Sequence, residues 1–176
     1  MHSFYFTPLQ SSHFPLLYKW MNTDSVAKWW GENLTWSLED ITQKYESYCK
    51  GYKRIGGVTK PIYAFMVEVD SQPIGFVQYY NAYDFPREDG VTLPKLSDKL
   101  AAIDFYIGEP DFIGKGLGPI ILNAFLKEHV KPMFNACFVD PDYANKQAIR
   151  AYEKAGFQRI DSSLQGYAVW MVKILD

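Results

Sequence analysis

The chain has 176 residues, of which 48% are hydrophobic, 17% aromatic and 22% charged. These proportions are typical of a globular protein and exclude a disordered one. The length is enough for one sizeable core, and we expect one domain over residues 1–176. The net charge of −2 gives no reason to expect nucleic acid as a partner, because such proteins usually present a basic face.

The N-terminal stretch MHSFYFTPLQ has no basic region followed by an apolar run, so no signal peptide is predicted. No apolar run reaches membrane-spanning length. Cys49 and Cys137 have neither a metal-type spacing nor the partners of a nucleophile, and Cys137, inside FNACFV, is predicted to be buried. We therefore expect a cytoplasmic protein without membrane contact.

Two helical stretches are predicted near the N-terminus. Apolar residues recur at helical spacing from Ser12 to Trp30, with a break at Asn22–Asp24. Ser37, followed three residues later by Asp40, predicts a capping box at the start of the next helix. That helix should continue toward Gly51.

The middle of the chain is predicted to form a sheet. IYAFMVEV (62–69) and IGFVQYY (74–80) flank a turn at 70–73, which predicts a hairpin. Residues 81–98 carry prolines, a glycine and charges, so we expect a long irregular connection of the kind that often belongs to a binding site. AAIDFYIG (101–108) is then predicted to be a buried strand.

The last third alternates strands and helices. Its predicted elements are a helix at 119–129, a strand at 133–140, a helix at 144–154 that ends at Gly156, and strands at 157–160 and 167–175. This order predicts one α+β domain with a mixed sheet.

The motif IGKGLG (113–118) lies between a predicted strand and a predicted helix. The first amides of a helix have no intrahelical acceptor, and the helix dipole adds partial positive charge, so they can bind an anion. Gly114, Gly116 and Gly118 would let a phosphate approach, and Lys115 adds a charge. A tight turn without a ligand fits the glycines equally well. The spacing matches neither a P-loop nor the GxGxxG of dinucleotide-binding proteins.

IGKGLG and the later segment DPDYANKQAIRAYEKAGF (140–157) together resemble the acetyl-coenzyme A signature of the GNAT superfamily of N-acetyltransferases. The later helix matches that signature at Asn145, Ala148, Tyr152, Gly156 and Phe157. One departure is Ile113, where Arg or Gln is commonest in the family. Backbone amides do most of the phosphate binding there, so the departure removes nothing essential.

Further segments are similar, in order, to aminoglycoside 6'-N-acetyltransferases, over about Leu16 to Met171. These segments are KWWG (28–31), IGFVQYY, AAID (101–104), IGKGLG and AIRAYEKAGF. Acyltransferases of siderophore assembly share some of them.

The resemblance implies a mixed, mostly antiparallel central sheet flanked by helices, with strand 101–108 splayed from strand 133–140. It also implies acetyl-CoA as acyl donor. The pantetheine arm would bond to the main chain of Phe105, Tyr106 and Ile107. The diphosphate would bind the amides of Ile113, Gly114, Lys115, Gly116, Leu117 and Gly118. Asn145 would bond to the cofactor arm, with a helix N-terminal cap as the alternative role.

Two residues are candidates for proton transfer. Asp104 interrupts an apolar strand, where an unpaired carboxylate would be costly, and it occupies the position of the proposed base in the aminoglycoside enzymes. Its alternative is a carboxylate that reaches solvent at a bulge. Tyr152 occupies the family position whose phenol can protonate the departing thiolate. Its alternative is a ring packed beneath the cofactor.

Three residues are candidates for substrate binding. Asp140 could bind a second substrate amine or cap the turn at Pro141, and Trp29 and Trp30 could pack on sugar rings or lie in the core. A group of acidic residues, mostly in predicted loops, could line a pocket for a cationic ligand or be solvated; they are Asp84, Glu88, Asp89, Asp104, Glu109, Asp111, Asp140 and Asp142. The isolated histidines predict no metal site.

The predicted function is transfer of acetyl from acetyl-CoA to the 6'-amine of an aminoglycoside antibiotic, by a monomer or homodimer. A different amine is the first alternative: a siderophore hydroxylamine or lysine, a polyamine, or a protein N-terminus. A non-catalytic CoA-binding module is the second, and the presence of both Asp104 and Tyr152 argues against it.

Overall fold

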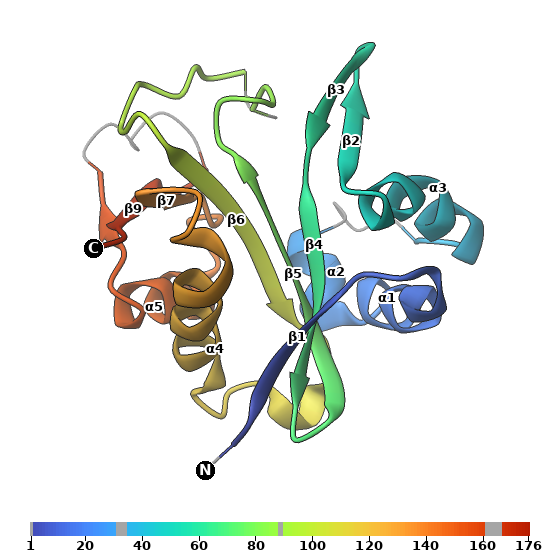
Figure 1. The fold of residues 1–176 in the computed structure, drawn as a ribbon. Helices are drawn as coiled ribbons and strands as arrows, with labels where there is room; N and C mark the ends of the chain where they lie inside the picture. Colours follow the sequence, from blue (N-terminus) through green and yellow to red (C-terminus); the bar gives the residue numbers. More distant parts are fainter. Residues whose placement is uncertain (1, 31–34, 88–89, 161–166) are drawn as a thin grey trace. The chain divides into compact units, whose positions relative to one another are not determined.

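The computed structural model describes residues 2–30, 35–87, 90–160 and 167–176 (Figure 1). Gly31 of the KWWG segment and Glu88 and Asp89 of the acidic group lie outside these residues. The chain divides into two compact units, the first formed by 1–78 and 104–115, the second by 79–103 and 116–176.

Seven strands form one sheet in the order β1-β4-β5-β6-β7-β9-β8. Two of them, β5 (Gln72–Asn81) and β6 (Leu100–Ile107), run through both units. The pairing of β6 with β7 is parallel, and the pairings of β1 with β4, β7 with β9 and β8 with β9 are antiparallel. The predicted α+β class with a mixed, mostly antiparallel sheet is confirmed.

The sheet strands that lie wholly in the first unit are β1 (Phe4–Pro8) and β4 (Tyr63–Val69), which pair from Phe4↔Val69 to Pro8↔Phe65. The predicted hairpin of β4 and β5 is present, and its turn is shorter than expected. Only Asp70 and Ser71 form it, both with left-handed backbone (φ 49° and 67°), as two-residue turns require. A separate hairpin, β2 (Tyr52–Ile55) with β3 (Val58–Pro61), was not predicted.

The helices of the first unit follow the predicted pattern. They are α1 (Phe14–Met21), α2 (Asp24–Trp30) and α3 (Leu38–Cys49), with short 3₁₀ turns at η1 (Ser11–His13) and η2 (Pro110–Phe112). Figure 1 shows α1 beside α2 and α3. The capping box at α3 is confirmed, because Ser37 Oγ accepts from the Asp40 amide at 3.0 Å while Asp40 Oδ2 accepts from the Ser37 amide at 2.8 Å. None of the described helices is long and apolar enough to cross a membrane.

Glu109, two residues after β6, forms hydrogen bonds with α1 within the first unit. Its Oε1 accepts from Lys19 Nζ at 2.7 Å and from Trp20 Nε1 at 2.8 Å. The Lys19 hydrogen bond holds the pKa of Glu109 below its ordinary value of 4.5, against the opposing effect of partial burial. The carboxylate therefore stabilises the fold above that ordinary pKa, and this stabilisation is lost as the pH falls through the folded-state pKa.

Glu109→Gln is accordingly expected to lower the free energy of unfolding by about 1.5–3 kcal/mol at neutral pH, the size of a hydrogen bond to a charged group. Urea unfolding at pH 7 and at about pH 3 should show the deficit shrinking in acid. The matched control is Glu46→Gln, whose pair with Lys50 at 3.5 Å is exposed and should matter little. An equal deficit at both pH values would contradict the assigned role of the charge.

Besides the end of β5 and the start of β6, the described residues of the second unit form two main helices and three short strands. These elements are α4 (Leu117–Phe125), which continues into a π-helical turn η3 (Leu126–Val130), β7 (Ala136–Val139), α5 (Lys146–Lys154), β8 (Gln158–Arg159) and β9 (Met171–Ile174). Each was predicted, and the strands are shorter than expected. Figure 1 shows α4 and α5 side by side. β7 pairs with β6 only from Leu100↔Ala136 to Ala102↔Phe138, so β6 runs on beyond this pairing.

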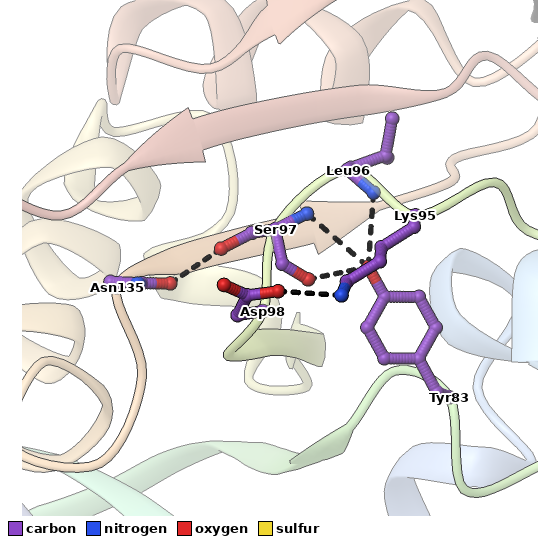
Figure 2. Close-up of polar contacts among 6 residues, drawn as sticks. All are labelled: Tyr83, Lys95, Leu96, Ser97, Asp98 and Asn135. Atoms are coloured by element: carbon purple, nitrogen blue, oxygen red, sulfur yellow. Dashed lines mark hydrogen bonds and ion pairs between the residues drawn. The ribbon is translucent and has the colours of Figure 1, made fainter.

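The long connection between β5 and β6 has no helix or strand in its described residues 82–87 and 90–99, as predicted. It is held by the Tyr83 hydroxyl, which accepts from the Leu96 amide at 3.0 Å and the Ser97 amide at 3.3 Å and donates to the Ser97 carbonyl at 2.9 Å (Figure 2). Ser97 Oγ in turn bonds to Oδ1 of Asn135 at 2.5 Å. The connection is therefore a folded part of the second unit.

Candidate active site

Asp104 lies on β6 in the first unit and is partly buried. Its Oδ2 accepts a hydrogen bond from Nε2 of Gln78, on β5, at 2.9 Å. Gln78 is buried, with 7% of its surface exposed, and its Oε1 has no hydrogen-bond partner among the residues that the structure describes. Because a buried carboxylate is costly unless it is paired, Gln78 supplies the partner that Asp104 needs and sets the direction of its carboxylate.

Two phenols of the first unit, those of Tyr45 and Tyr48, interact electrostatically with this carboxylate. Burial and the nearby Asp104 charge raise the pKa of Tyr48, and burial raises the pKa of Tyr45 and of Tyr106. These three phenols therefore stay neutral at physiological pH.

The predicted tryptophans both lie at the end of α2. The Trp30 ring stands edge-on to Phe76 at 6.1 Å and to Tyr106 at 4.7 Å between centroids, so it packs into an aromatic cluster of the first unit. Trp29 is half-buried, with Lys28 Nζ 4.9 Å from its ring centroid. Contact of either ring with a substrate stays a prediction.

The first unit contains the first three residues of the predicted diphosphate loop, Ile113, Gly114 and Lys115. Gly114 and Lys115 are exposed. Phe105, Tyr106 and Ile107 form the last residues of β6, as the predicted pantetheine contact requires. That contact stays a prediction.

Gly116 opens α4 in the second unit, with a left-handed backbone (φ 76°). No side chain caps the helix there, and a Cβ on Gly116 would meet nothing within 4 Å. The amides of the first turn, which includes Leu117 and Gly118, are therefore open to an anion. These residues fit the diphosphate of acetyl-CoA.

Asn145 and Tyr152 are both on α5 in the second unit. Asn145 Oδ1 accepts from the Ala148 amide at 3.1 Å, so the N-cap role is observed and Nδ2 is the atom left to donate to a cofactor. Tyr152 is buried at 8% exposure, with its ring edge-on to Phe157 at 5.4 Å. Their contacts with acetyl-CoA stay predictions.

Asp140 follows β7 and forms an ion pair with Arg87 of the long connection. The sequence pattern did not predict this partner. Gln78, too, was missed, although its signal was visible as an amide side chain inside the apolar strand IGFVQYY. Arg87 left no such signal, because it lies among other polar residues of an irregular segment.

Comparisons with known proteins identify the family of this chain. A family model described as an acetyltransferase (GNAT) domain matches residues 10–163. The aminoglycoside N(6')-acetyltransferase type 1 of Klebsiella pneumoniae is 28% identical over 162 residues, which are 90% of this chain and 76% of that protein.

Solved structures are similar over nearly the whole chain. AAC(6')-Ib in complex with ribostamycin and coenzyme A has a TM-score of 0.78 at 26% identity, over 98% of this chain and 93% of that one. The spermidine N-acetyltransferase of Vibrio cholerae, in complex with CoA and spermine, has a TM-score of 0.71 at 14% identity, over 97% and 95% of the two chains, and shares the fold. This chain therefore belongs to the GNAT acetyltransferase family and is an enzyme that uses acetyl-CoA as acyl donor.

Proposed function

We propose that this enzyme acetylates the 6'-amine of an aminoglycoside antibiotic. The observation that carries the proposal is the Asp104 carboxylate, held by Gln78 at 2.9 Å among neutral phenols of the first unit. A fixed anion of this kind suits a substrate that arrives as an ammonium ion. The proteins named above, with their aminoglycoside names and ligands, support the same substrate class.

The chemistry assigns one task to each residue. Acetyl-CoA, when bound, supplies the acetyl group as a thioester. Asp104 binds the substrate ammonium and takes one proton from it, which frees the nitrogen lone pair to form the new N–C bond. Tyr152 donates the proton that the sulfur needs when its bond to carbon breaks, and the second proton that the nitrogen loses as the amide forms restores the Tyr152 phenol by way of solvent.

Binding of the two partners follows from the same residues. The amides of Gly116, Leu117 and Gly118 hold the diphosphate, with Lys115 as an added positive charge. Nδ2 of Asn145 donates to the cofactor arm. Trp29 is the stronger candidate for contact with a sugar ring, because the Trp30 ring is engaged with Phe76 and Tyr106.

The test measures coenzyme A release from acetyl-CoA with kanamycin, which has an amine at position 6', and with paromomycin, which has a hydroxyl there. We expect turnover with kanamycin and none with paromomycin, and mass spectrometry of the product should place one acetyl group on the 6' nitrogen. Spermidine, a lysine-derived hydroxylamine and a peptide N-terminus serve as competing amines. Turnover with one of these alone would overturn the substrate assignment.

A further inference from the structure

Gln78 is a polar residue in the buried part of β5. The strand is buried without interruption from Ile74 to Tyr79, and Gln78 itself is 7% exposed. Among the residues that the structure describes, it is the single buried residue with an amide or charged side chain. Burial of an amide is unfavourable unless its polar atoms are paired, so this position calls for a specific reason.

Only one of the two polar atoms of the Gln78 amide is paired among the described residues. Nε2 donates to Asp104 Oδ2 at 2.9 Å, whereas Oε1 is buried and has no hydrogen-bond partner there. The amide cannot turn over to exchange the two atoms, because an ionised carboxylate only accepts and would then face the amide oxygen. The side chain therefore keeps its bond to Asp104 and leaves a buried acceptor unpaired, which destabilises the folded state.

The neighbours of Gln78 in the first unit hold its amide in place. β5 and β6 are adjacent in the sheet, and the rings of Phe76 and Tyr106 lie 5.7 Å apart between centroids. Residues two apart on a strand lie on the same face, so this aromatic pair stands beside the Gln78–Asp104 pair. Tyr45 of α3 packs on Phe76 at 5.5 Å. The amide is therefore preorganised and loses little freedom when it binds the carboxylate.

The hydrogen bond from Gln78 favours the ionised form of Asp104, which is the form that a base needs. Two other titratable groups interact with this carboxylate from α3, and they are the phenols of Tyr45 and Tyr48. Both phenols are neutral, so neither adds a positive charge beside Asp104. The Gln78 donor thus acts on the carboxylate without help from a cation among these groups.

We propose that Gln78 is a positioning residue, whose donated hydrogen bond aims the Asp104 carboxylate and favours its ionised form. It acts on acetyl transfer only through Asp104, and its buried Oε1 touches neither substrate nor cofactor. This inference rests on the proposed function, because it takes Asp104 as the base. The unpaired Oε1 is explained as the consequence of keeping Nε2 directed at the carboxylate.

The first experiment compares the pH dependence of kcat/KM for Gln78→Met, which keeps the length of the side chain and removes its donor. We expect kcat to fall about 10- to 100-fold, as for a reacting group slightly out of place. The acid limb of kcat/KM should move to higher pH by about one to two pH units, the equivalent of one hydrogen bond to a charged group. Gln78→Glu, which puts a second carboxylate against Asp104, should move it further in the same direction.

Two controls separate this role from a structural one. Gln43→Met makes the same replacement at an exposed amide of α3, which donates to Glu39 at 3.3 Å, and should change neither kcat nor the pH profile. Val77→Ala weakens the packing of β5, so it should lower the melting temperature and leave the acid limb where it is. If Gln78→Met loses stability and rate while its acid limb stays in place, the positioning role is overturned.

The second experiment tests whether Gln78 acts through Asp104. In the Asp104→Asn background, Gln78→Met should lower kcat by no more than about twofold, because the base that it positions is already gone. An equal loss of kcat in both backgrounds would give Gln78 a role of its own and refute the inference.

Failure of the proposed function would look different. If kanamycin is not turned over, the same variants are assayed with the competing amine that is, and urea unfolding reports on the pair without any substrate. At pH 7 the effects of Gln78→Met and Asp104→Asn on stability should be coupled, and the coupling should shrink at about pH 3, where the carboxylate takes up a proton. Additive effects at both pH values would refute the role of Gln78 whatever the substrate is.

Discussion

Replacing Asp104 by asparagine is expected to reduce kcat by about 10²- to 10⁴-fold, the usual effect of losing a general base. Asparagine has the same shape and can still accept from Gln78 Nε2, so the local packing should survive. It cannot take a proton from the substrate nitrogen. The residual rate of the variant should therefore rise with pH as more of the substrate amine loses its proton in solution.

The measurement is steady-state coenzyme A release with kanamycin from pH 6 to about pH 9, the range over which the free amine fraction grows. Calorimetric titration with coenzyme A should give the same affinity for Asp104→Asn and for the unaltered protein. Asp70→Asn is the matched control, because Asp70 is exposed at the β4–β5 turn, where asparagine tolerates the left-handed backbone. A variant with a raised KM and an unchanged kcat would reduce Asp104 to a binding residue.

Strong local signals made much of the fold predictable from the sequence. The break between α1 and α2, the capping box at Ser37 and the glycine that ends α5 are each determined by a few adjacent residues. β1, β2 and β3 were missed because they are four or five residues long and mostly partly exposed, so they have no buried face to create a clear alternation.

The candidate site residues that could be predicted are those in short sequence motifs. They are Asp104, Asn145, Tyr152 and the glycine loop, and such a motif can be recognised without knowing what lies beside it in the fold. The pairs Gln78–Asp104 and Arg87–Asp140 join residues 26 and 53 positions apart. Only the folded chain brings such partners together, so a carboxylate that looks available in the sequence can already be engaged in the structure.

Gly108→Ala is expected to lower the free energy of unfolding by about 3 kcal/mol, the upper range for overpacking a core. Gly108 directly follows β6 in the first unit, and its amide donates to the Ile74 carbonyl at 2.7 Å. A Cβ at this position would stand 2.2 Å from Cγ of Trp20, whose indole is fully buried. Relief requires the indole to move, which breaks its hydrogen bond to Glu109.

Thermal unfolding should show a fall of about 6–12 °C, as expected for 3 kcal/mol in a chain of this size. Gly57→Ala is the control for the substitution itself, because a Cβ there meets nothing within 4 Å and the cost is limited to the left-handed backbone (φ 79°), about 1–2 kcal/mol. The double variant Gly108→Ala/Trp20→Phe distinguishes a clash with the indole from damage to the backbone of β6. If the indole is the obstacle, the double variant loses less stability than the sum of the two single variants. Additive losses would place the damage in the backbone of β6, which also carries Asp104, and kcat should then fall with stability.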